Sequence, residues 1–181
     1  MHLRPIPHGS SRWASSVSAS FSIVRVERGD AVALDEIRRL FEEYHRWLGD
    51  VVCATRLTEE IRTLPHPYER PQGELLLARD SSGTAAGCIA VRSHTGPSCE
   101  IKRLYVRPAY RGAGLGGSLT QAALDVCREL GYREARLTTL PDSMPGALAM
   151  YRAFGFEQAP PFEDHSHVGE GVEILFMRLE L

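Results

Sequence analysis

"RLYVRPAYRGAGLGGSL", residues 103–119, begins as an apolar strand, meets a proline and then places four glycines ahead of and within a second apolar run. Short glycine-rich segments between a strand and a helix let successive backbone N–H groups converge on an anion, and the positive end of the helix dipole adds to the attraction. We therefore expect a phosphate-bearing ligand at this turn. The spacing of the glycines and of one arginine indicates which class of ligand fits.

Three phosphate-binding patterns compete for this turn. The P-loop pattern requires Gly-Lys followed by Ser or Thr, whereas this chain has Gly-Ser without the lysine. Gly112, Gly114 and Gly117 satisfy the dinucleotide fingerprint GxGxxG, but four residues separate the turn from its strand and no acidic residue ends the next strand. The third pattern, R-x-x-G-x-G, begins at Arg111 and places a guanidinium before the N–H groups. This last pattern suits a pyrophosphate.

The strand before the turn breaks its own alternation. In "EIKRLYV", residues 100–106, the apolar Ile101 and Leu104 lie three positions apart, so a regular strand cannot point both inward. A β-bulge near Lys102 or Arg103 would restore the register and leave one backbone N–H without a partner. A strand covered on both faces would need no alternation, and this alternative stays open on the sequence.

Hydrophobic periodicity and turn residues predict one sheet with helices on its faces. The expected helix caps are Asp30, Thr58, and Asp142 or Ser143. The order of elements is typical of a mixed α/β sheet in a single domain. The expected segments are strand 21–29, helix 30–49, helix 58–64, a hairpin of strands 73–80 and 87–93, strand 98–106, helix 115–130, strand 135–140, helix 142–156 and strand 172–181. The apolar stripe expected to pack into the core from the first helix is Leu34, Ile37, Leu40, Phe41, Tyr44, Trp47 and Leu48.

The composition and net charge of the chain narrow the classes of molecule that it could bind. A chain of 181 residues with 43% hydrophobic residues can bury one core, and its formal charge of -2 provides no broad positive field for nucleic acid or anionic lipid. Four cysteines without CxxC spacing argue against a zinc site or a disulfide framework and favour a reducing cytoplasm. No apolar run reaches the roughly 20 residues that span a bilayer. We expect a small-molecule or protein partner, and neither nucleic acid nor membrane.

Residues 1–20 form a separate segment, rich in serine and without an acidic residue. We expect a disordered tail, or translation of a segment upstream of the native start. A transit peptide is the alternative, but Pro5, Pro7 and Gly9 oppose a long amphipathic helix. The folded domain is expected to cover residues 21–181.

The pattern that starts at Arg111 resembles the acyl-CoA-binding motif [QR]-x-x-G-x-[GA] of the GNAT superfamily of N-acetyltransferases, on a strand that ends in "LYV-x-P". A second segment, "ALAMYRAFGF" at 147–156, resembles the family's later A-x-x-x-Y-x-x-x-G-F stretch. The resemblance covers the element order of residues 21–181. It implies a single-domain GNAT-like α/β fold: a central, mostly antiparallel sheet with a splayed parallel strand pair, flanked by helices.

The resemblance also implies an activity. It is acetyl-CoA-dependent N-acetyl transfer to a small-molecule or peptide amine, by direct transfer in a ternary complex, with acetyl-CoA as the acyl-donor cosubstrate and no metal. A non-catalytic acyl-CoA-binding regulatory module on the same fold is the alternative. A dinucleotide-binding oxidoreductase would require that NAD binds and CoA does not. The oligomeric state stays open, a homodimer included.

Carried onto this chain, the resemblance implies two groups of cofactor-binding residues. The pantetheine arm pairs like an added strand with the bulged strand, and the N–H freed by the bulge faces the thioester carbonyl. The strand residues are Leu104, Tyr105 and Val106. The pyrophosphate residues are Arg111, Gly112, Ala113, Gly114, Leu115 and Gly116, followed by Gly117 and Ser118, which open the helix.

Two residues are implied as catalytic. An amine with a pKa of about 10.4 must lose a proton before it attacks, and Glu100 is the candidate base. The alternative for Glu100 is a structural carboxylate paired with Lys102 or Arg103. Tyr151 matches the tyrosine that points at the CoA sulfur in relatives and would donate to the departing thiolate; the alternative is a core aromatic.

One feature departs from the family pattern, and two further groups of residues allow a functional and a plain interpretation. The asparagine that many relatives carry after the fifth strand is absent, so Thr139 or Ser143 replaces it or the contact is lost. His165 and His167 stand beside two acids, but a loop of this kind more often carries exposed polar residues than a metal. Acids expected near the acceptor could attract a cationic amine or form a solvated face; they are Glu42, Glu43, Asp50, Glu59 and Glu60.

Overall fold

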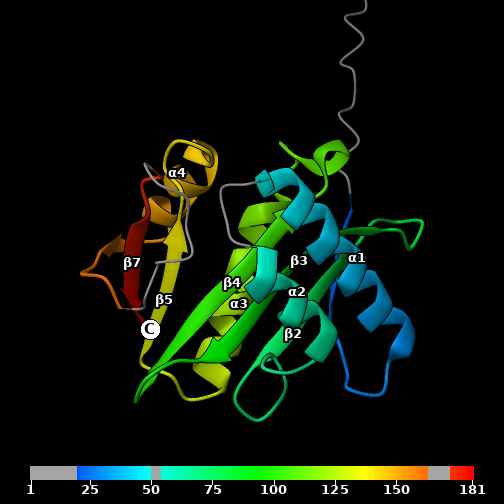
Figure 1. The fold of residues 1–181 in the computed structure, drawn as a ribbon, viewed down its shortest axis with the longest axis horizontal. Coiled ribbons are helices and arrows are strands. Elements are labelled where there is room, and N and C mark those ends of the chain that lie inside the picture. The colour runs from blue at the N-terminus through cyan, green and yellow to red at the C-terminus, as the bar shows by residue number, and fades with distance from the viewer. Residues whose placement is uncertain (1–19, 50–53, 163–171) are drawn as a thin grey trace, which may run out of the picture.

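A computed structural model describes residues 20–49, 54–162 and 172–181 of the chain (Figure 1). A seven-stranded sheet runs through the molecule in the order β1-β2-β3-β4-β5-β7-β6. The expected tail falls almost wholly outside the described residues. The strands are β1 (Ser22–Arg25), β2 (Glu74–Arg79), β3 (Ala85–Ser93), β4 (Ser98–Val106), β5 (Glu134–Thr139), β6 (Glu157–Gln158) and β7 (Leu175–Glu180).

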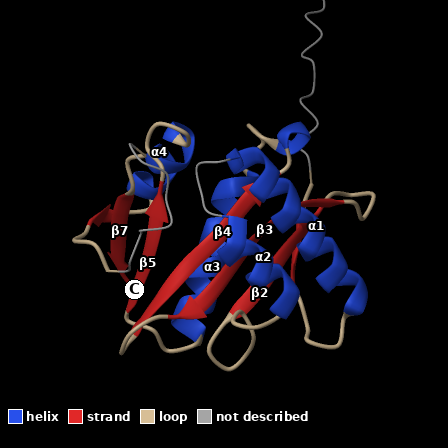
Figure 2. Ribbon diagram, in the orientation of Figure 1, coloured by secondary structure: helices blue, strands red, loops and turns tan. Residues whose placement is uncertain are grey.

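One neighbouring pair in the sheet is parallel, and it is held together along part of its length. Ser98–Glu100 of β4 pair in parallel with Glu134–Arg136 of β5, and the two strands do not pair beyond these residues. All other neighbouring strands pair antiparallel. Beyond Glu100 the two strands run on as separate arms of a fork (Figure 2). The mixed, mostly antiparallel sheet with one splayed parallel pair is thus confirmed.

Helices cover both faces of the sheet. Helices α1 (Ala31–Leu48) and α2 (Ala54–Thr63) lie on one face, and α3 (Leu115–Glu129) lies behind the same strands on the other (Figure 1). Helix α4 (Pro145–Ala153) packs into the same core as α3. The sheet therefore separates two hydrophobic cores, one under α1 and one shared by α3 and α4. No helix in the described residues is long and apolar enough to cross a membrane.

Local sequence explains most element ends, and two predicted caps are wrong. Helix α1 starts as expected, because the Asp30 side chain accepts from the backbone N–H of Ala33 at 2.9 Å. Helix α2 begins at Ala54, ahead of Thr58, so Thr58 lies inside the helix and does not cap it. Helix α4 is preceded by Met144 with Pro145 at its first position, and neither expected side chain caps it.

Two elements of the structure were not predicted, because they are too short to show a hydrophobic repeat in the sequence. A single 3-10 turn, Pro108–Tyr110, follows β4, and the two-residue strand β6 closes one edge of the sheet. Three residues per turn or two paired residues are too few to show an apolar repeat. The 3-10 turn nevertheless matters, because it sets the distance between β4 and the glycine-rich segment.

The bulge lies where the broken alternation predicts it. Cys88 pairs with Tyr105, but Ala90 pairs with Lys102, so β4 has one residue more than β3 between these points. Arg103, within the extra stretch, has a φ of 59°. Residues before the bulge and after it can therefore both reach the core under α3 and α4, which resolves the broken alternation.

The hairpin turn between β2 and β3 supports the 3-10 turn. Oδ1 of Asp80 accepts from the Ser82 and Thr84 backbone N–H groups at 2.9 and 3.0 Å. Its Oδ2 accepts from the Tyr110 hydroxyl at 2.8 Å. Hydrogen bonds from Ser82 and Tyr110 lower the pKa of Asp80 from 3.8 to about 2. The ionised carboxylate is therefore the form that holds the turn.

We expect Asp80→Asn to destabilise the protein at pH 7 by weakening these hydrogen bonds. Because the folded-state pKa is lowered, the stabilisation is complete above pH 3.8 and is lost as the pH falls toward 2. Urea midpoints of wild type and variant should differ at pH 7 and converge as the pH falls through this range. A difference that stays constant with pH would contradict the assignment.

Candidate active site

A cleft of about 560 Å³ lies beside the end of β4, between α1, the glycine-rich turn and the start of α4. Most of the expected cofactor residues line it, while Ala113, Ser118 and both candidate catalytic residues do not. The expected residues in the lining are Leu104, Tyr105, Val106, Arg111, Gly112, Gly114, Leu115, Gly116 and Gly117. The structure thus brings the strand end and the turn together.

The glycine-rich turn presents a row of unengaged backbone donors. Within the part of the chain that the structure describes, none of the amides from Gly112 to Gly117 donates a hydrogen bond to the protein. Gly112 and Gly114 both have a φ of 80°, and an added Cβ would meet nothing within 4 Å at either. The N-terminus of α3 begins directly after Gly114. These donors and the helix dipole fit a diphosphate.

Arg111 lies against the end of β4. Its Nε donates to the Val106 carbonyl at 2.9 Å, and its guanidinium lies 5.3 Å from the centroid of the Trp47 ring and 5.9 Å from that of Tyr105. Both distances are within cation–π range. The guanidinium thus stands at the junction between strand, turn and α1.

Two aromatic residues of α1 line the cleft although the sequence analysis did not expect them there. The helical stripe predicts Tyr44 and Trp47 as core; Tyr44 packs against the core under α1 and also lines the cleft, whereas Trp47 lines the cleft and is 43% exposed. Their rings stack on each other, and Tyr44 also contacts Tyr105. The sequence contained one sign of this position: the two aromatic residues lie near the end of the helix, where its apolar stripe extends beyond the edge of the core.

The two residues proposed to replace the family's asparagine lie in different places. Ser143 lines the cleft, next to the start of α4. Thr139, at the end of β5, is buried, and its hydroxyl has no hydrogen-bond partner among the described residues. Ser143 is therefore the better placed of the two for a ligand in the cleft.

Tyr151 lies on α4, in the core shared with α3. Its side chain is buried and its ring packs edge-on against Phe156, with centroids 5.7 Å apart. Burial raises the pKa of Tyr151, and the nearby Tyr44 adds to the shift. We find no hydrogen bond from its phenol to a described residue. The hydroxyl is therefore protonated at neutral pH and available to another partner.

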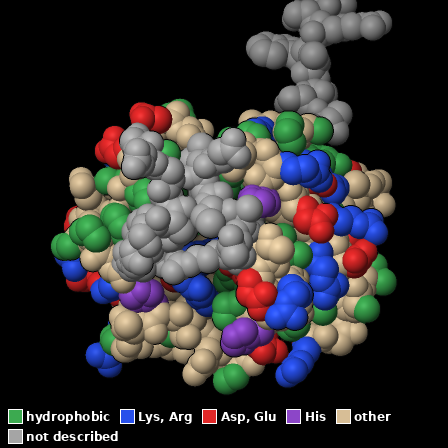
Figure 3. All heavy atoms as spheres, in the orientation of Figure 1, with side chains coloured by type: hydrophobic (Ala, Val, Ile, Leu, Met, Phe, Trp, Pro, Cys, Tyr) green, Lys and Arg blue, Asp and Glu red, His purple; other side chains and the backbone are tan. Residues whose placement is uncertain are grey.

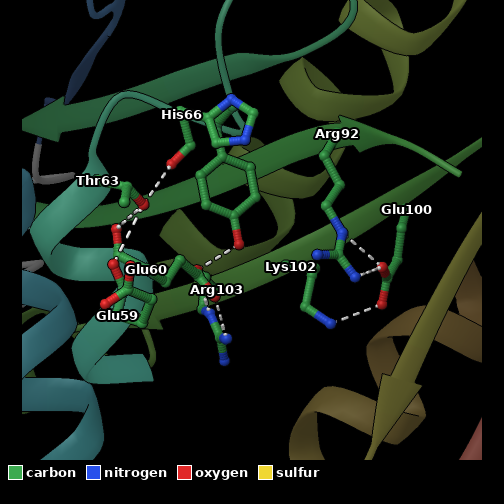
Figure 4. A network of polar contacts seen from close by, with 9 residues as sticks. Glu59, Glu60, Thr63, His66, Arg92, Glu100, Lys102 and Arg103 are labelled. Atoms are coloured by element: carbon green, nitrogen blue, oxygen red, sulfur yellow. Dashed lines mark hydrogen bonds and ion pairs between the residues drawn. The ribbon is translucent and has the colours of Figure 1, made fainter. Parts of the chain in front are cut away.

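The surroundings of Glu100 do not suit a general base that must accept a proton. Its side chain is 0% exposed, and it accepts from Arg92 Nε at 2.8 Å and from Lys102 Nζ at 2.7 Å (Figure 4). Burial alone would raise the pKa of Glu100, but the two cations outweigh it and hold that pKa below its ordinary value. This arrangement favours the structural carboxylate, with Arg92 as the partner that the sequence did not indicate.

Acids near the expected acceptor side are largely compensated. Glu43 pairs with Arg107, Glu59 with Arg62, and Glu60 with Arg103. Figure 3 shows acidic and basic side chains interspersed over the face that carries α1 and α2. Glu42 is exposed, and Asp50 lies outside the described residues. A general acidic rim is therefore not what distinguishes this face.

The histidine pair of the sequence analysis, residues 165 and 167, also lies outside the described residues. In the ranges that are described, no group of three or more His, Cys, Asp or Glu side chains could hold a metal ion. The donors that line the cleft are backbone amides, one guanidinium and hydroxyls. Such a set suits an organic phosphate.

Comparison with known proteins agrees with this geometry. The sequence profile described as the Acetyltransferase (GNAT) family matches residues 34–156. An uncharacterized N-acetyltransferase of Schizosaccharomyces pombe is 37% identical over 149 residues, which are 82% of this chain and 88% of the relative. An IAA acetyltransferase of Azospirillum brasilense is 35% identical over 71% of this chain and 81% of its own.

A solved structure of a GNAT family acetyltransferase from Elizabethkingia anophelis, with acetyl-CoA bound, shares the fold. It has a TM-score of 0.60 at 18% identity and covers 89% of this chain and 98% of its own. The sheet, the splayed pair and the motif-bearing turn are thus accounted for by one family. The chain belongs to the GNAT family of acetyltransferases, whose members take an acetyl group from acetyl-CoA.

We expect Gly114→Ala to weaken CoA binding about tenfold, because an alanine held at a φ of 80° costs about 1–2 kcal/mol and the turn would shift to relieve it. Isothermal calorimetry with CoA measures the change. Gly83→Ala is the matched control, since Gly83 has a φ of 86°, has equally open surroundings and lies in the β2–β3 turn. Equal CoA affinities in the two variants would contradict the role of the turn.

Proposed function

We propose that this protein transfers the acetyl group of acetyl-CoA directly to an amine of a small molecule or peptide, in a ternary complex. The observation that carries the proposal is the row of unengaged amides from Gly112 to Gly117, at a helix N-terminus beside the fork between β4 and β5. Members of the family to which the chain belongs bind acetyl-CoA.

A reducing cytoplasm remains our expectation for the location of the protein, supported by the buried, free thiols of Cys88, Cys99 and Cys127.

The donor would bind along two surfaces at once. The amides of the turn and the guanidinium of Arg111 would hold the diphosphate, while the pantetheine arm would run along β4 at Leu104–Val106. Arg111 now donates to the Val106 carbonyl, and a phosphate would compete for that guanidinium. The fork supplies the space, because β5 does not pair with this part of β4.

The thioester carbonyl would then lie at the bulge. An amide that is not used in the strand ladder can donate to the carbonyl oxygen and stabilise the negative charge that develops on it. The amine nitrogen forms the new C–N bond, the C–S bond breaks, and CoA leaves as a thiol. The amine loses one proton and the sulfur gains one, so protons balance over the reaction.

Tyr151 is the proposed donor to the departing sulfur. Its phenol is protonated at neutral pH and unengaged by described residues, and a CoA thiolate with a pKa of about 8.5 leaves more easily when a donor faces it. Tyr151 does not line the cleft itself, but Ala147 and Met150 of the same helix do.

Glu100 is proposed to act as a structural carboxylate that holds Arg92 and Lys102 beside the fork. The base role requires a carboxylate that can accept a proton, and two cations at hydrogen-bond distance oppose this. No acidic side chain lines the cleft in the described part of the chain. The amine would therefore lose its proton to water.

Tyr151→Phe should lower kcat by about a hundredfold while the KM for acetyl-CoA changes little, because the hydroxyl acts only as the thiolate leaves. Thiol release from acetyl-CoA, measured with a panel of amines, gives both constants. Tyr132→Phe is the control, since it removes a hydroxyl that donates to the Gln72 carbonyl away from the cleft. Undiminished turnover in Tyr151→Phe would remove the assigned role. CoA binding without turnover of any amine would favour the regulatory module instead.

Glu100→Gln should destabilise the protein at pH 7 by about 3 kcal/mol, because it replaces a fully buried carboxylate that accepts from two cations by a neutral amide. Because the pKa of Glu100 is lowered in the folded protein, its carboxylate stabilises the fold at neutral pH and loses this effect as the pH falls. The variant lacks this stabilisation at pH 7. Urea unfolding measures this change, and the pH profile of kcat/KM tests the base. A profile whose acid limb disappears in the variant would show that Glu100 accepts the proton after all.

A further inference from the structure

The bulge of β4 holds an unusual residue. Arg103 is the one non-glycine residue with positive φ in the described ranges, at 59°. Side chains other than glycine, asparagine and aspartate rarely adopt this left-handed conformation. A residue keeps it only when the surrounding structure imposes it, and such residues cluster at functional sites. The question is what imposes it here.

The Arg103 side chain is held by a carboxylate from another element. Its Nε and Nη2 donate to the two oxygens of Glu60 on α2, at 2.7 and 2.6 Å (Figure 4). Both side chains are largely buried, with 14% and 10% exposed. A planar guanidinium that meets both oxygens of a carboxylate has little rotational freedom. The pair therefore fixes the direction in which the side chain leaves the bulge.

The carboxylate is itself held from a second side. The Tyr68 hydroxyl donates to Glu60, and the Tyr68 ring is buried at 1% exposed, edge-on to Phe41 of α1. The nearby Arg103, through its hydrogen bonds and charge, outweighs burial and holds the pKa of Glu60 below its ordinary value. Glu60 is thus an anion at neutral pH, attached to the bulge, to α2 and to the segment after α2.

We propose that Glu60, Arg103 and Tyr68 form a bulge clamp that fixes the left-handed backbone at residue 103 and so aims the freed strand amide at the thioester carbonyl. The inference rests on the proposed function, which places the thioester there. The three are positioning residues, because they act through the backbone and not on the substrate. Without the clamp, the bulge would relax and the amide would point elsewhere, so kcat would fall while CoA binding at the glycine-rich turn persisted.

The test uses the difference between alanine and glycine at residue 103. Both remove the guanidinium, but only glycine adopts positive φ without strain. Each substitution is made with Glu60→Gln, so that no unpaired carboxylate is left buried. Kinetics with acetyl-CoA and an accepted amine then give kcat and KM for each double variant.

We expect Glu60→Gln/Arg103→Ala to lose about tenfold or more in kcat, Glu60→Gln/Arg103→Gly to recover part of this loss, and the KM for acetyl-CoA to stay within about twofold in both. A purely structural ion pair predicts the opposite order, because glycine destabilises a strand more than alanine does. Equal kcat values in the two double variants, or a higher value for alanine, would overturn the clamp.

A matched control removes a similar ion pair nearby. Glu43 of α1 and Arg107, just after β4, also form a bidentate pair, at 2.7 and 2.9 Å, but Arg107 has an ordinary φ of -54°. Glu43→Gln/Arg107→Ala should therefore keep kcat within about threefold of wild type. A loss as large as that of the Arg103→Ala double variant would show that any ion pair of this kind matters, and would overturn the specific role of the bulge.

A readout independent of turnover separates this inference from the proposed function. Backbone NMR chemical shifts of residue 103 report its conformation, and they should leave the left-handed range in Glu60→Gln/Arg103→Ala. Chemical shifts that stay in the left-handed range would overturn the clamp even if kcat fell.

If the wild type acetylates no amine, the proposed function fails, but these chemical shifts still decide whether the clamp imposes the conformation of the bulge. If the alanine double variant does not fold, Glu60→Gln alone is measured, and unchanged kcat and shifts there would overturn the clamp.

Discussion

The parting of β4 from β5 is the constraint on which the rest of this structure depends. The two parallel strands exchange hydrogen bonds over only three residue pairs, up to Glu100, and then separate. A continuous sheet would leave no place for a ligand to pair with a strand edge in the middle of the molecule. Because the strands separate, the end of β4 keeps an open edge inside the fold, and the cleft, the turn and the start of α4 are arranged around it.

Buried charge marks that fork on the face toward α2. Glu100, Lys102 and Arg103 occupy neighbouring positions along β4; Glu100 pairs with Lys102 and with Arg92 of β3, and Arg103 pairs with Glu60 of α2 (Figure 4). Ion pairs of this kind add little to net stability, since desolvation offsets most of the attraction. Their geometric effect is larger, because each fixes the direction of a side chain on β4, at the last residue that pairs with β5 or just beyond it. These groups connect β4 to β3 and to α2.

The cleft itself has a different character. Aromatic rings of Tyr44, Trp47 and Tyr105 form one wall around the guanidinium of Arg111, and unengaged amides form the other. Attraction for the donor therefore comes from backbone dipoles and one cation, in a protein whose net charge is slightly negative. Local geometry, and not the overall field, would select an anionic ligand here.

The sequence by itself determined the longer elements and the glycine-rich turn, and it offered the bulge as one of two interpretations, because each of these is a local pattern: apolar periodicity, glycines after a strand and a broken alternation. It also placed Asp30 at the start of α1, whereas the parallel pair in the sheet was expected from the resemblance to the family. It did not reveal the cap of α4, the role of Trp47 or the partners of Glu100 and Arg103. Only the tertiary structure decided those, since Arg92 pairs with Glu100 across two strands and Glu60 reaches Arg103 over 43 residues of chain. Contacts of that range depend on how helices lie on the sheet, which no local pattern encodes.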